Sequence, residues 1–382
     1  MKIIIVIFYS IANFCYLSGQ TLPKIGKDHT LEICNWNIEW FGKIGFGPKD
    51  KELQFNNIKN VINESDIDLF AFQEVANALV FDSLMKHLPN YNYCISNYSS
   101  ELKIAFAYKK QIFKLVECKI IGNDSQAFFS TGRFPLEITL VPQFDIGIDT
   151  LFLINIHLKA HTGTTQEKQN AYQSRKRSCD WIRNYLLENY KNKYFMVLGD
   201  WNDDIDESIY NAWPSPMSGL ILNPDFHFLT QVFNQRKLGT TAKYPDAIDH
   251  QLVSSALNIK WVYNQTDLID LRNYLINYST TTSDHFPVYS IFNTYTLKAK
   301  PIDINQSKIN LINPNPANNI IELNKEFEYS NLKVFDTFGR DLKGAFKIIE
   351  NEVYVNNLPV GIYWMMGIAN GEIFKVKFVI ER

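Results

Sequence analysis

Six short segments of the sequence combine acidic, amide or imidazole side chains with an adjoining apolar run. They are Cys34-Asn35-Trp36-Asn37, Phe72-Gln73-Glu74, Asn155-Ile156-His157-Leu158, Leu198-Gly199-Asp200-Trp201-Asn202, Ala247-Ile248-Asp249-His250 and Ser283-Asp284-His285-Phe286-Pro287. Each places its polar residues at the carboxyl end of a strand-like run or in the loop just after it, where a rigid sheet presents side chains to a shared cleft. Together they supply the carboxylates, histidines and amides that metal-assisted phosphoryl hydrolysis requires.

Alternating strand-like and helix-like patterns define the elements that would position these segments. Strands are expected at 31–37, 68–72, 91–96, 103–108, 112–121, 136–141, 151–157, 194–198, 247–253, 259–263 and 286–292, and helices at 51–64, 78–88 and 166–190. Many strands mixed with a few helices predict a layered α/β protein with at least one large, partly antiparallel sheet.

The order of the polar segments resembles the endonuclease/exonuclease/phosphatase superfamily, also called the deoxyribonuclease-I-like fold. The matching residues are Trp36-Asn37, Gln73-Glu74, His157, Gly199-Asp200-Trp201-Asn202, Asp249-His250 and Ser283-Asp284-His285, with Lys103–Tyr108 and Arg133-Phe134-Pro135 as further similar segments. The resemblance spans residues 30–293. It implies a four-layer α/β/β/α sandwich, and we place this catalytic domain at 20–296. It also implies a hydrolase that acts on phosphoric ester bonds.

The resemblance further implies a role for each of these positions. Metal ligands would be Asn37, Glu74 and Asp284, and catalytic residues would be His157, Asp200, Asn202, Asp249 and His285. Oxygen ligands favour Mg²⁺, with Mn²⁺ or Ca²⁺ as alternatives. Asp200 would orient or deprotonate the attacking water, and Asp249 would hold the His285 ring that stabilises the phosphate. Taken singly, each residue has a structural explanation such as a turn or a helix cap.

Three functions are compatible with these residues. The first is a nuclease that hydrolyses DNA or RNA. The second is a phosphatase or phosphodiesterase on lipid or sugar phosphates, such as sphingomyelin or inositol phosphates. The third is a catalytically inactive surface binding protein, although none of the key acids is missing. The Trp-Cys-Asp-Arg run typical of inositol-polyphosphate phosphatases is absent; Tyr244–His250 occupies that region and is more similar to nuclease-type members.

The overall charge gives little indication of a nucleic-acid partner held by charge alone. The 382 residues include 38 basic and 40 acidic side chains, for a net charge of −2. A purely electrostatic binder of nucleic acid would be strongly basic. Lys168, Arg175, Lys176, Arg177 and Arg183 could form a phosphate track on the helix 166–190, but a solvated helix face explains them better.

The first residues have the pattern of a secretory signal peptide at 1–19. Met1-Lys2 is followed by an apolar run to about Leu17 and by the small or polar residues Ser18-Gly19-Gln20. A membrane anchor is the alternative, but a spanning helix needs about 20 mainly apolar residues. We therefore expect no stable membrane insertion. Of the cysteines after this segment, we expect buried free thiols, with a disulfide as the alternative in an exported protein.

The C-terminal part of the chain has a different composition. Residues 297–310 are polar and suit a linker, and 311–382 contain strand-length apolar runs between turn dipeptides, which predicts a small all-β sandwich. Asn313–Ala317, Val334–Arg340 and Leu358–Tyr363 resemble the landmarks of type IX secretion C-terminal sorting domains. The resemblance implies the type IX machinery as partner and a secreted or cell-surface location reached through the periplasm. A carbohydrate-binding β-sandwich is the alternative.

Overall fold

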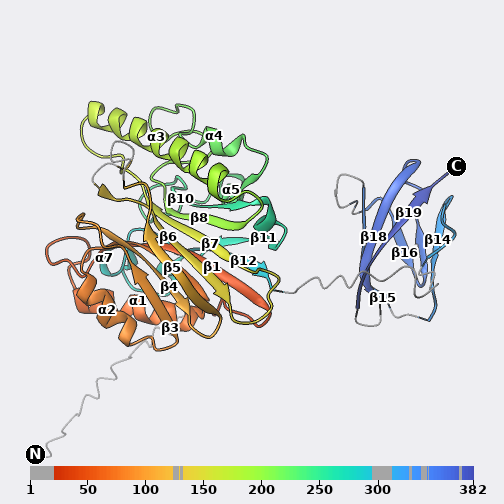
Figure 1. The fold of residues 1–382 in the computed structure, drawn as a ribbon, viewed down its shortest axis with the longest axis horizontal. Coiled ribbons are helices and arrows are strands. Elements are labelled where there is room, and N and C mark those ends of the chain that lie inside the picture. Colours follow the sequence, from red (N-terminus) through yellow and green to blue (C-terminus); the bar gives the residue numbers. More distant parts are fainter. Residues whose placement is uncertain are drawn as a thin grey trace, which may run out of the picture. The chain divides into compact units, whose positions relative to one another are not determined.

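The structure is a computed structural model that describes residues 21–123, 129, 132–294, 312–326, 329–336, 342, 344–369 and 372–382 (Figure 1). The chain divides into two compact units, Met1–Tyr295 and Thr296–Arg382. The expected signal peptide at 1–19 and the whole of the expected linker at 297–310 lie outside the described residues. Among the described residues, no helix is long and apolar enough to cross a membrane.

The first unit is built on two six-stranded sheets. The order in one sheet is β11 (Trp261–Leu268), β12 (Val288–Asn293), β1 (Thr30–Phe41), β2 (Leu69–Val75), β4 (Lys103–Lys109) and β3 (Tyr91–Ile95). The order in the other is β5 (Phe113–Ile120), β6 (Leu136–Pro142), β7 (Leu151–His157), β8 (Tyr194–Asp200), β10 (Asp249–Ser254) and β9 (Phe226–Phe228). β1–β2 and β7–β8 are parallel pairs and the others are antiparallel, so both sheets are mixed.

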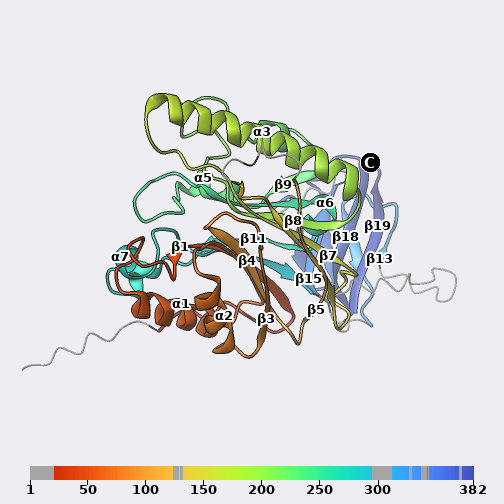
Figure 2. The same cartoon turned by 60° about the vertical axis from the view of Figure 1, so that its left-hand side comes forward.

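Helices cover the outer faces of the two sheets (Figure 2). α1 (Lys51–Ser65) and α2 (Ala78–Lys86) pack on the first sheet, and α3 (Thr165–Asn189) and α4 (Ser218–Ile221) on the second. Shorter elements are α5 (Gln231–Arg236), α6 (Ser255–Asn258), η2 (Leu271–Asn273) and α7 (Tyr278–Thr281). Thr164 and Glu167 form a capping box that fixes where α3 begins. The predicted four-layer sandwich is therefore confirmed.

A disulfide links the edge strands of the two sheets. Cys94 on β3 and Cys118 on β5 are bonded, with 6.7 Å between their Cα atoms. The preference for free thiols was wrong for this pair and holds for Cys34 and Cys179, which are buried and free. The pairing depends on two sheet edges meeting in space, and the spacing of cysteines along the chain does not reveal such a contact.

The second unit is all-β, as predicted. β13 (Ile312–Asn313), β14 (Ile320–Leu323), β17 (Glu352–Tyr354) and β16 (Lys347–Ile349) form one antiparallel sheet, and β15 (Tyr329–Phe335), β18 (Gly361–Ala369) and β19 (Glu372–Ile380) form another. A small core that includes Val334, Val353, Met365 and Phe378 stabilises this unit.

Candidate active site

The polar segments meet at one edge of the two packed sheets. β1 and β2 are parallel, so Asn37 lies beside Gln73, directly before Glu74. β7 and β8 are also parallel, and His157 lies beside Asp200. Because β10 is antiparallel to β8, its first residue, Asp249, pairs with Asp200 at the same edge.

One element of the strand-end prediction needs correction. Asp249 is the first residue of β10, and Asp284 and His285 precede β12, so these residues do not follow the carboxyl ends of strands. They reach the site because β10 runs antiparallel to β8, and β12 runs antiparallel to β1. The start of β10 therefore lies beside the end of β8, and the start of β12 lies beside β1 near its end. Chemistry at a strand start cannot be assigned to an edge until the strand direction is known.

The backbone is bent where it presents the acidic side chains. Glu74 has a φ of 60°, and the pairing registers of β1–β2 and β2–β4 both shift around it. A bulge of this kind turns a side chain out of the strand's alternation. Asn202 and Glu39 also have positive φ values, of 55° and 38°. Non-glycine residues in this region are strained and cluster at functional sites.

Gly199 lets β8 approach β7 closely just before Asp200. A Cβ atom at this position would lie 2.2 Å from the carbonyl oxygen of Ile156, and the glycine has a φ of 136°. Any side chain here would push the two strands apart. Gly199 therefore fixes the position of Asp200 relative to His157.

Glu74 and Asn37 form the first part of the site. Glu74 Oε2 accepts a hydrogen bond from the Trp40 amide at 3.0 Å, and Asn37 Oδ1 accepts one from the Glu39 amide at 3.0 Å. Burial raises the pKa of Glu74. The nearby Glu39, which the sequence analysis did not select, has a pKa raised to about 7 by burial and by the charge of Asp284.

Asp200 lies at the centre of the site. Its Oδ2 accepts a hydrogen bond from Asn37 Nδ2 at 3.0 Å, and its Oδ1 accepts one from the Asn202 amide at 2.9 Å. The Asn202 side chain itself donates to the Leu158 carbonyl at 3.2 Å. Burial is the main cause that raises the pKa of Asp200 to about 7, with Asp249 contributing. This carboxylate is thus hydrogen-bonded to residues of both sheets. Its pKa lies near neutral pH, so it can accept a proton there.

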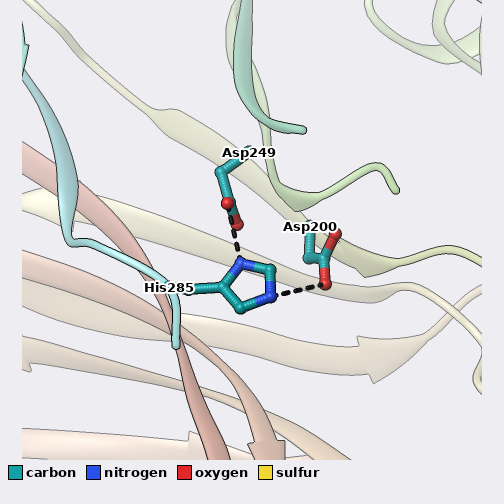
Figure 3. A group of neighbouring side chains, drawn as sticks. All are labelled: Asp200, Asp249 and His285. Carbon is teal, nitrogen blue, oxygen red and sulfur yellow. Dashed lines mark hydrogen bonds and ion pairs between the residues drawn. The ribbon is translucent and has the colours of Figure 1, made fainter. Parts of the chain in front are cut away.

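His285 and Asp249 form a hydrogen-bonded pair beside Asp200 (Figure 3). His285 Nδ1 lies 2.8 Å from Asp249 Oδ2, and its Nε2 lies 3.9 Å from Asp200 Oδ2. Burial alone would lower the pKa of this imidazole, but the charges of Asp249 and Asp200 outweigh burial and raise the pKa well above its usual value. Thr240 Oγ1 donates to Asp249 Oδ2 at 2.7 Å and helps to hold the pair.

His157 lies on the other side of Asp200, with a cationic neighbour. Its Nε2 is 3.5 Å from Asp200 Oδ2 and 3.8 Å from Glu74 Oε1. Arg133 Nη1 lies 2.8 Å from the same Nε2, and Arg133 Nη2 donates to the Leu158 carbonyl at 3.2 Å. Burial and the Arg133 charge lower the pKa of His157 well below its usual value. Its ring is therefore neutral at physiological pH.

Asp284 lies at the more exposed rim of the site. Its Oδ2 pairs with Lys243 Nζ at 3.2 Å, and its Oδ1 lies 4.0 Å from His285 Nε2. The structure thus brings all eight selected residues to one edge. Sequence reasoning did not assign Arg133, Glu39 or Thr240 to the site, although Arg133 lies in a segment with a family resemblance.

Several other residues near these segments are structural. Trp201 is fully buried, and its indole donates to the His250 carbonyl at 3.1 Å, so it belongs to the core and does not border the cleft. His250 is buried between Thr230 and the Asp203 carbonyl, and His161 packs near the Tyr210 ring. On α3, Arg175 is buried and pairs with Asp203 at 2.8 Å, so it cannot form part of a surface phosphate track.

The donor set fits a divalent cation on the Glu74 side. Glu74, Glu39 and Asp200 bring several carboxyl groups into a poorly hydrated region, and their raised pKa values reflect that burial. A hard cation would compensate the charge, since it prefers oxygen ligands. Asp200, Asp249 and His285 also offer ligand atoms within 4.8 Å of one another. There, however, His285 Nδ1 and Asp249 Oδ2 are already joined by a hydrogen bond, so we regard that group as a dyad.

This two-sheet fold, with acidic and imidazole groups at one edge, defines a class of phosphoester hydrolases. The chain belongs to the Endonuclease/Exonuclease/phosphatase family, which residues 34–285 match. Members of the family hydrolyse phosphoester bonds and typically use divalent metals. No curated protein sequence matches the chain.

Solved structures of the same fold include proteins from animals and bacteria. D. rerio TDP2 in complex with single strand DNA product is 16% identical, with a TM-score of 0.53, 70% of this chain covered and 100% of that chain. The human Nocturnin catalytic domain with a bound sulfate anion is 17% identical, with a TM-score of 0.50 and coverage of 69% and 93%. An endonuclease/exonuclease/phosphatase from Bacteroides vulgatus is 14% identical, with a TM-score of 0.50 and coverage of 69% and 98%. These similarities establish the fold.

The second unit matches a secretion system C-terminal sorting domain over residues 311–381. Such a domain directs its protein to the type IX secretion machinery, and the protein is accordingly secreted or held at the cell surface. The sequence-based prediction of location is confirmed.

Proposed function

We propose that the protein is a secreted, metal-dependent nuclease that hydrolyses phosphodiester bonds of DNA or RNA by in-line attack of water. The observation that supports this most strongly is the convergence of Glu74, Asn37, Asp200 and the Asp249–His285 pair at one edge, where Asn37 Nδ2 lies 3.0 Å and His285 Nε2 3.9 Å from Asp200 Oδ2. These groups can bind a cation, accept a proton and donate one at a single phosphate, which is what phosphodiester hydrolysis demands.

Glu74 and Asn37 would hold the cation, with Asp284 nearby at the rim, and Mg²⁺ is the ion that best suits these oxygen ligands. Bound there, the cation would polarise the phosphate and stabilise its developing negative charge. The bulge at Glu74 and the Trp40 amide keep the carboxylate in place.

Asp200 would orient the attacking water and accept its proton. Asn37 and the Asn202 amide each occupy one of its oxygens, so the carboxylate cannot rotate freely. A pKa of about 7 suits a group that must be ionised to accept a proton and yet bind it well at neutral pH. The Asn202 side chain is held by the Leu158 carbonyl and would contact the attacking water beside Asp200.

His285 would donate a hydrogen bond or a proton to the phosphate through Nε2. Asp249 holds the opposite nitrogen, which fixes the ring orientation and keeps the imidazole charged. His157 would act differently. Because it is neutral and held by Arg133, we assign it to positioning the phosphate beside Glu74 and Asp200.

The rim of the site favours a nucleic-acid substrate. Trp40 and Phe46 stack with 4.5 Å between their ring centroids, and Tyr244 is 65% exposed. Lys43 lies over the Phe46 ring. Lys243, next to Tyr244 in the chain, lies at the rim, where it pairs with Asp284. Aromatic faces next to lysines suit bases and phosphates of a single strand. The structurally similar TDP2 was captured with a single strand DNA product.

Digestion of supercoiled plasmid, single-stranded DNA and RNA with Mg²⁺ and with EDTA tests the proposal. We expect cleavage with Mg²⁺, none in EDTA, and loss of cleavage in Glu74→Gln. Glu188→Gln, an exposed acid on α3, is the matched control and should cleave normally. Full activity in EDTA, or an active Glu74→Gln protein, would overturn the proposal.

A lipid phosphodiester is the second candidate substrate, because apolar side chains are exposed beside the same rim. Ile44 is 86% exposed and Leu79 is 81% exposed. Apolar surface flanked by lysines can insert into a headgroup region. Sphingomyelin vesicles in the same assay distinguish the two: turnover of sphingomyelin with intact nucleic acid would favour the lipid.

A further inference from the structure

A second pocket lies away from the catalytic edge, where the outer strands of the two sheets meet. It has a volume of about 560 Å³ and is bordered by β9, α5 and β11. β9 pairs with the far half of β10, with Phe226 opposite Ser254, whereas Asp249 opens β10 at the catalytic end. Phe228, which lines the pocket, pairs with Leu252, three positions along β10 from Asp249, which corresponds to about 10 Å. No residue of the catalytic constellation lines this pocket.

Amide side chains dominate the polar part of the lining. They are Asn223, Gln231, Asn234, Gln235, Asn258 and Asn264. Gln231 and Gln235 are four residues apart on α5 and so lie on one face of that helix. Within the described part of the chain, the side chains of Gln231, Gln235, Asn258 and Asn264 make no hydrogen bond to another residue. Each amide can therefore both donate and accept a hydrogen bond to a ligand.

Aromatic rings form part of the apolar lining, beside aliphatic side chains such as Ile205, Ile221 and Leu229. The ring centroids of Trp261 and Tyr263 lie 5.8 Å apart, with 62° between the ring planes, and Phe228 on β9 also lines the pocket. The pairing of β11 with β12 shifts register between Trp261 and Thr266, and Asn264 has a φ of 61°. This bulge interrupts the regular alternation of β11 side chains between the two faces of the sheet. Tyr263 is 80% exposed, so its ring is available to a ligand.

The charge of the lining decides the class of ligand. Among the described residues that border the pocket there is no lysine or arginine, and one carboxylate, Asp206, is present. A phosphate-bearing ligand would find no cation and one negative charge, so a nucleotide is disfavoured. Many amides beside exposed aromatic rings suit a ligand with numerous neutral hydroxyls and apolar C–H faces. Carbohydrates have that chemistry.

We propose that this pocket binds a segment of neutral oligosaccharide, a function separate from phosphodiester hydrolysis. Sugar rings would pack on Trp261 and Tyr263, and their hydroxyls would bond to the amides of α5 and β11. A secreted or cell-surface hydrolase with such a site would be retained on a polysaccharide while its catalytic edge remains open to substrate.

Isothermal titration calorimetry and saturation-transfer NMR on the purified full chain test this proposal. The probes are maltotriose, cellotriose and triacetylchitotriose, with uridine monophosphate as the phosphate-bearing comparison. We expect at least one trisaccharide to bind with a dissociation constant on the order of 1 mM or tighter. Tyr263→Ala should weaken that binding about three- to tenfold through loss of one stacking contact, and Tyr263→Phe should keep most of it.

Two controls make the result decisive. Phe144→Ala removes an exposed aromatic ring elsewhere on the same unit and should leave sugar binding unchanged. Nuclease activity should be the same in Tyr263→Ala and in the unmodified protein, which separates this pocket from the proposed active site. No binding of any trisaccharide at concentrations on the order of 10 mM, or binding that Tyr263→Ala does not weaken, would overturn the proposal. So would uridine monophosphate binding that Tyr263→Ala abolishes.

Discussion

The two sides of the catalytic edge contain the same residue type in opposite electrostatic surroundings. His285 and His157 are both buried and lie 3.9 Å and 3.5 Å from the same oxygen of Asp200. Asp249 raises the pKa of His285, whereas burial and Arg133 lower the pKa of His157. The charge of the neighbouring side chain thus sets the protonation state of each histidine. One site can therefore contain a protonated histidine that donates a proton and a neutral histidine that positions the phosphate at the same pH.

The largest expected effect comes from replacing the charged histidine, His285. His285→Gln should reduce kcat by about 10³-fold, because a group that donates to the phosphate contributes on the order of 10²–10⁴. Single-turnover cleavage of an oligonucleotide measures the effect. His157→Gln should cost less, since a neutral side chain replaces a neutral ring. Equal losses of kcat in His285→Gln and His157→Gln would show that the different pKa values of the two histidines do not affect catalysis.

Asp249→Asn should produce a smaller loss and a shift in pH dependence. The Asp249 carboxylate raises the pKa of His285, so its removal lowers that pKa. The protonated, active form would then be lost at lower pH, and the alkaline limb of the rate profile should move down by about one to three pH units. The pH profile of kcat/KM over the stable range tests this. An unshifted alkaline limb would remove His285 as the proton donor.

Arg133→Met changes the surroundings of the second histidine, His157. Without the guanidinium, the pKa of His157 should rise, yet it should remain below its ordinary value because burial, the larger cause, is unchanged. Histidine resonances followed by NMR against pH measure this directly. We expect a rate loss of about tenfold, which is smaller than for His285→Gln. A fall in the pKa of His157 would contradict the assigned role of Arg133.

The disulfide should have the smallest effect on catalysis. Cys94 and Cys118 join the sheet edges by β3 and β5, and 24 residues separate them in the sequence. Replacing both by serine should reduce the free energy of unfolding by about 3 kcal/mol through the entropy of the unfolded chain. Denaturant unfolding measures the loss, and kcat should be unchanged under native conditions. A large fall in kcat would mean that the edge-to-edge link also positions the site.

Much of the first unit was predictable because its strands and long helices have strong periodicity. β7 (Leu151–His157) and α3 (Thr165–Asn189) match the expected 151–157 and 166–190 within a residue. The three-residue strand β9 and the short helices α4 to α7 were not predicted, because so few residues show no period. Tertiary contacts alone determine such elements.

The eight site residues were selected by type and order, and the structure gathers them at one edge. Besides Thr240, three features of this unit were missed, each for a physical reason. Glu39 is one of many acids, and only its burial and strained backbone distinguish it. Arg133 reaches His157 from a segment 24 residues earlier, a contact that has no counterpart in sequence spacing. The disulfide depends on how the two sheets pack.

Metal binding measured separately from catalysis tests whether Glu74 holds the catalytic cation. Electron paramagnetic resonance of Mn²⁺ would follow occupancy in the unmodified protein, in Glu74→Gln and in His285→Gln. We predict that Glu74→Gln loses both Mn²⁺ binding and cleavage, whereas His285→Gln loses cleavage and retains Mn²⁺. If Glu74→Gln binds Mn²⁺ as tightly as the unmodified protein, the cation does not lie where the strand ends meet, and the proposed metal-dependent mechanism is wrong.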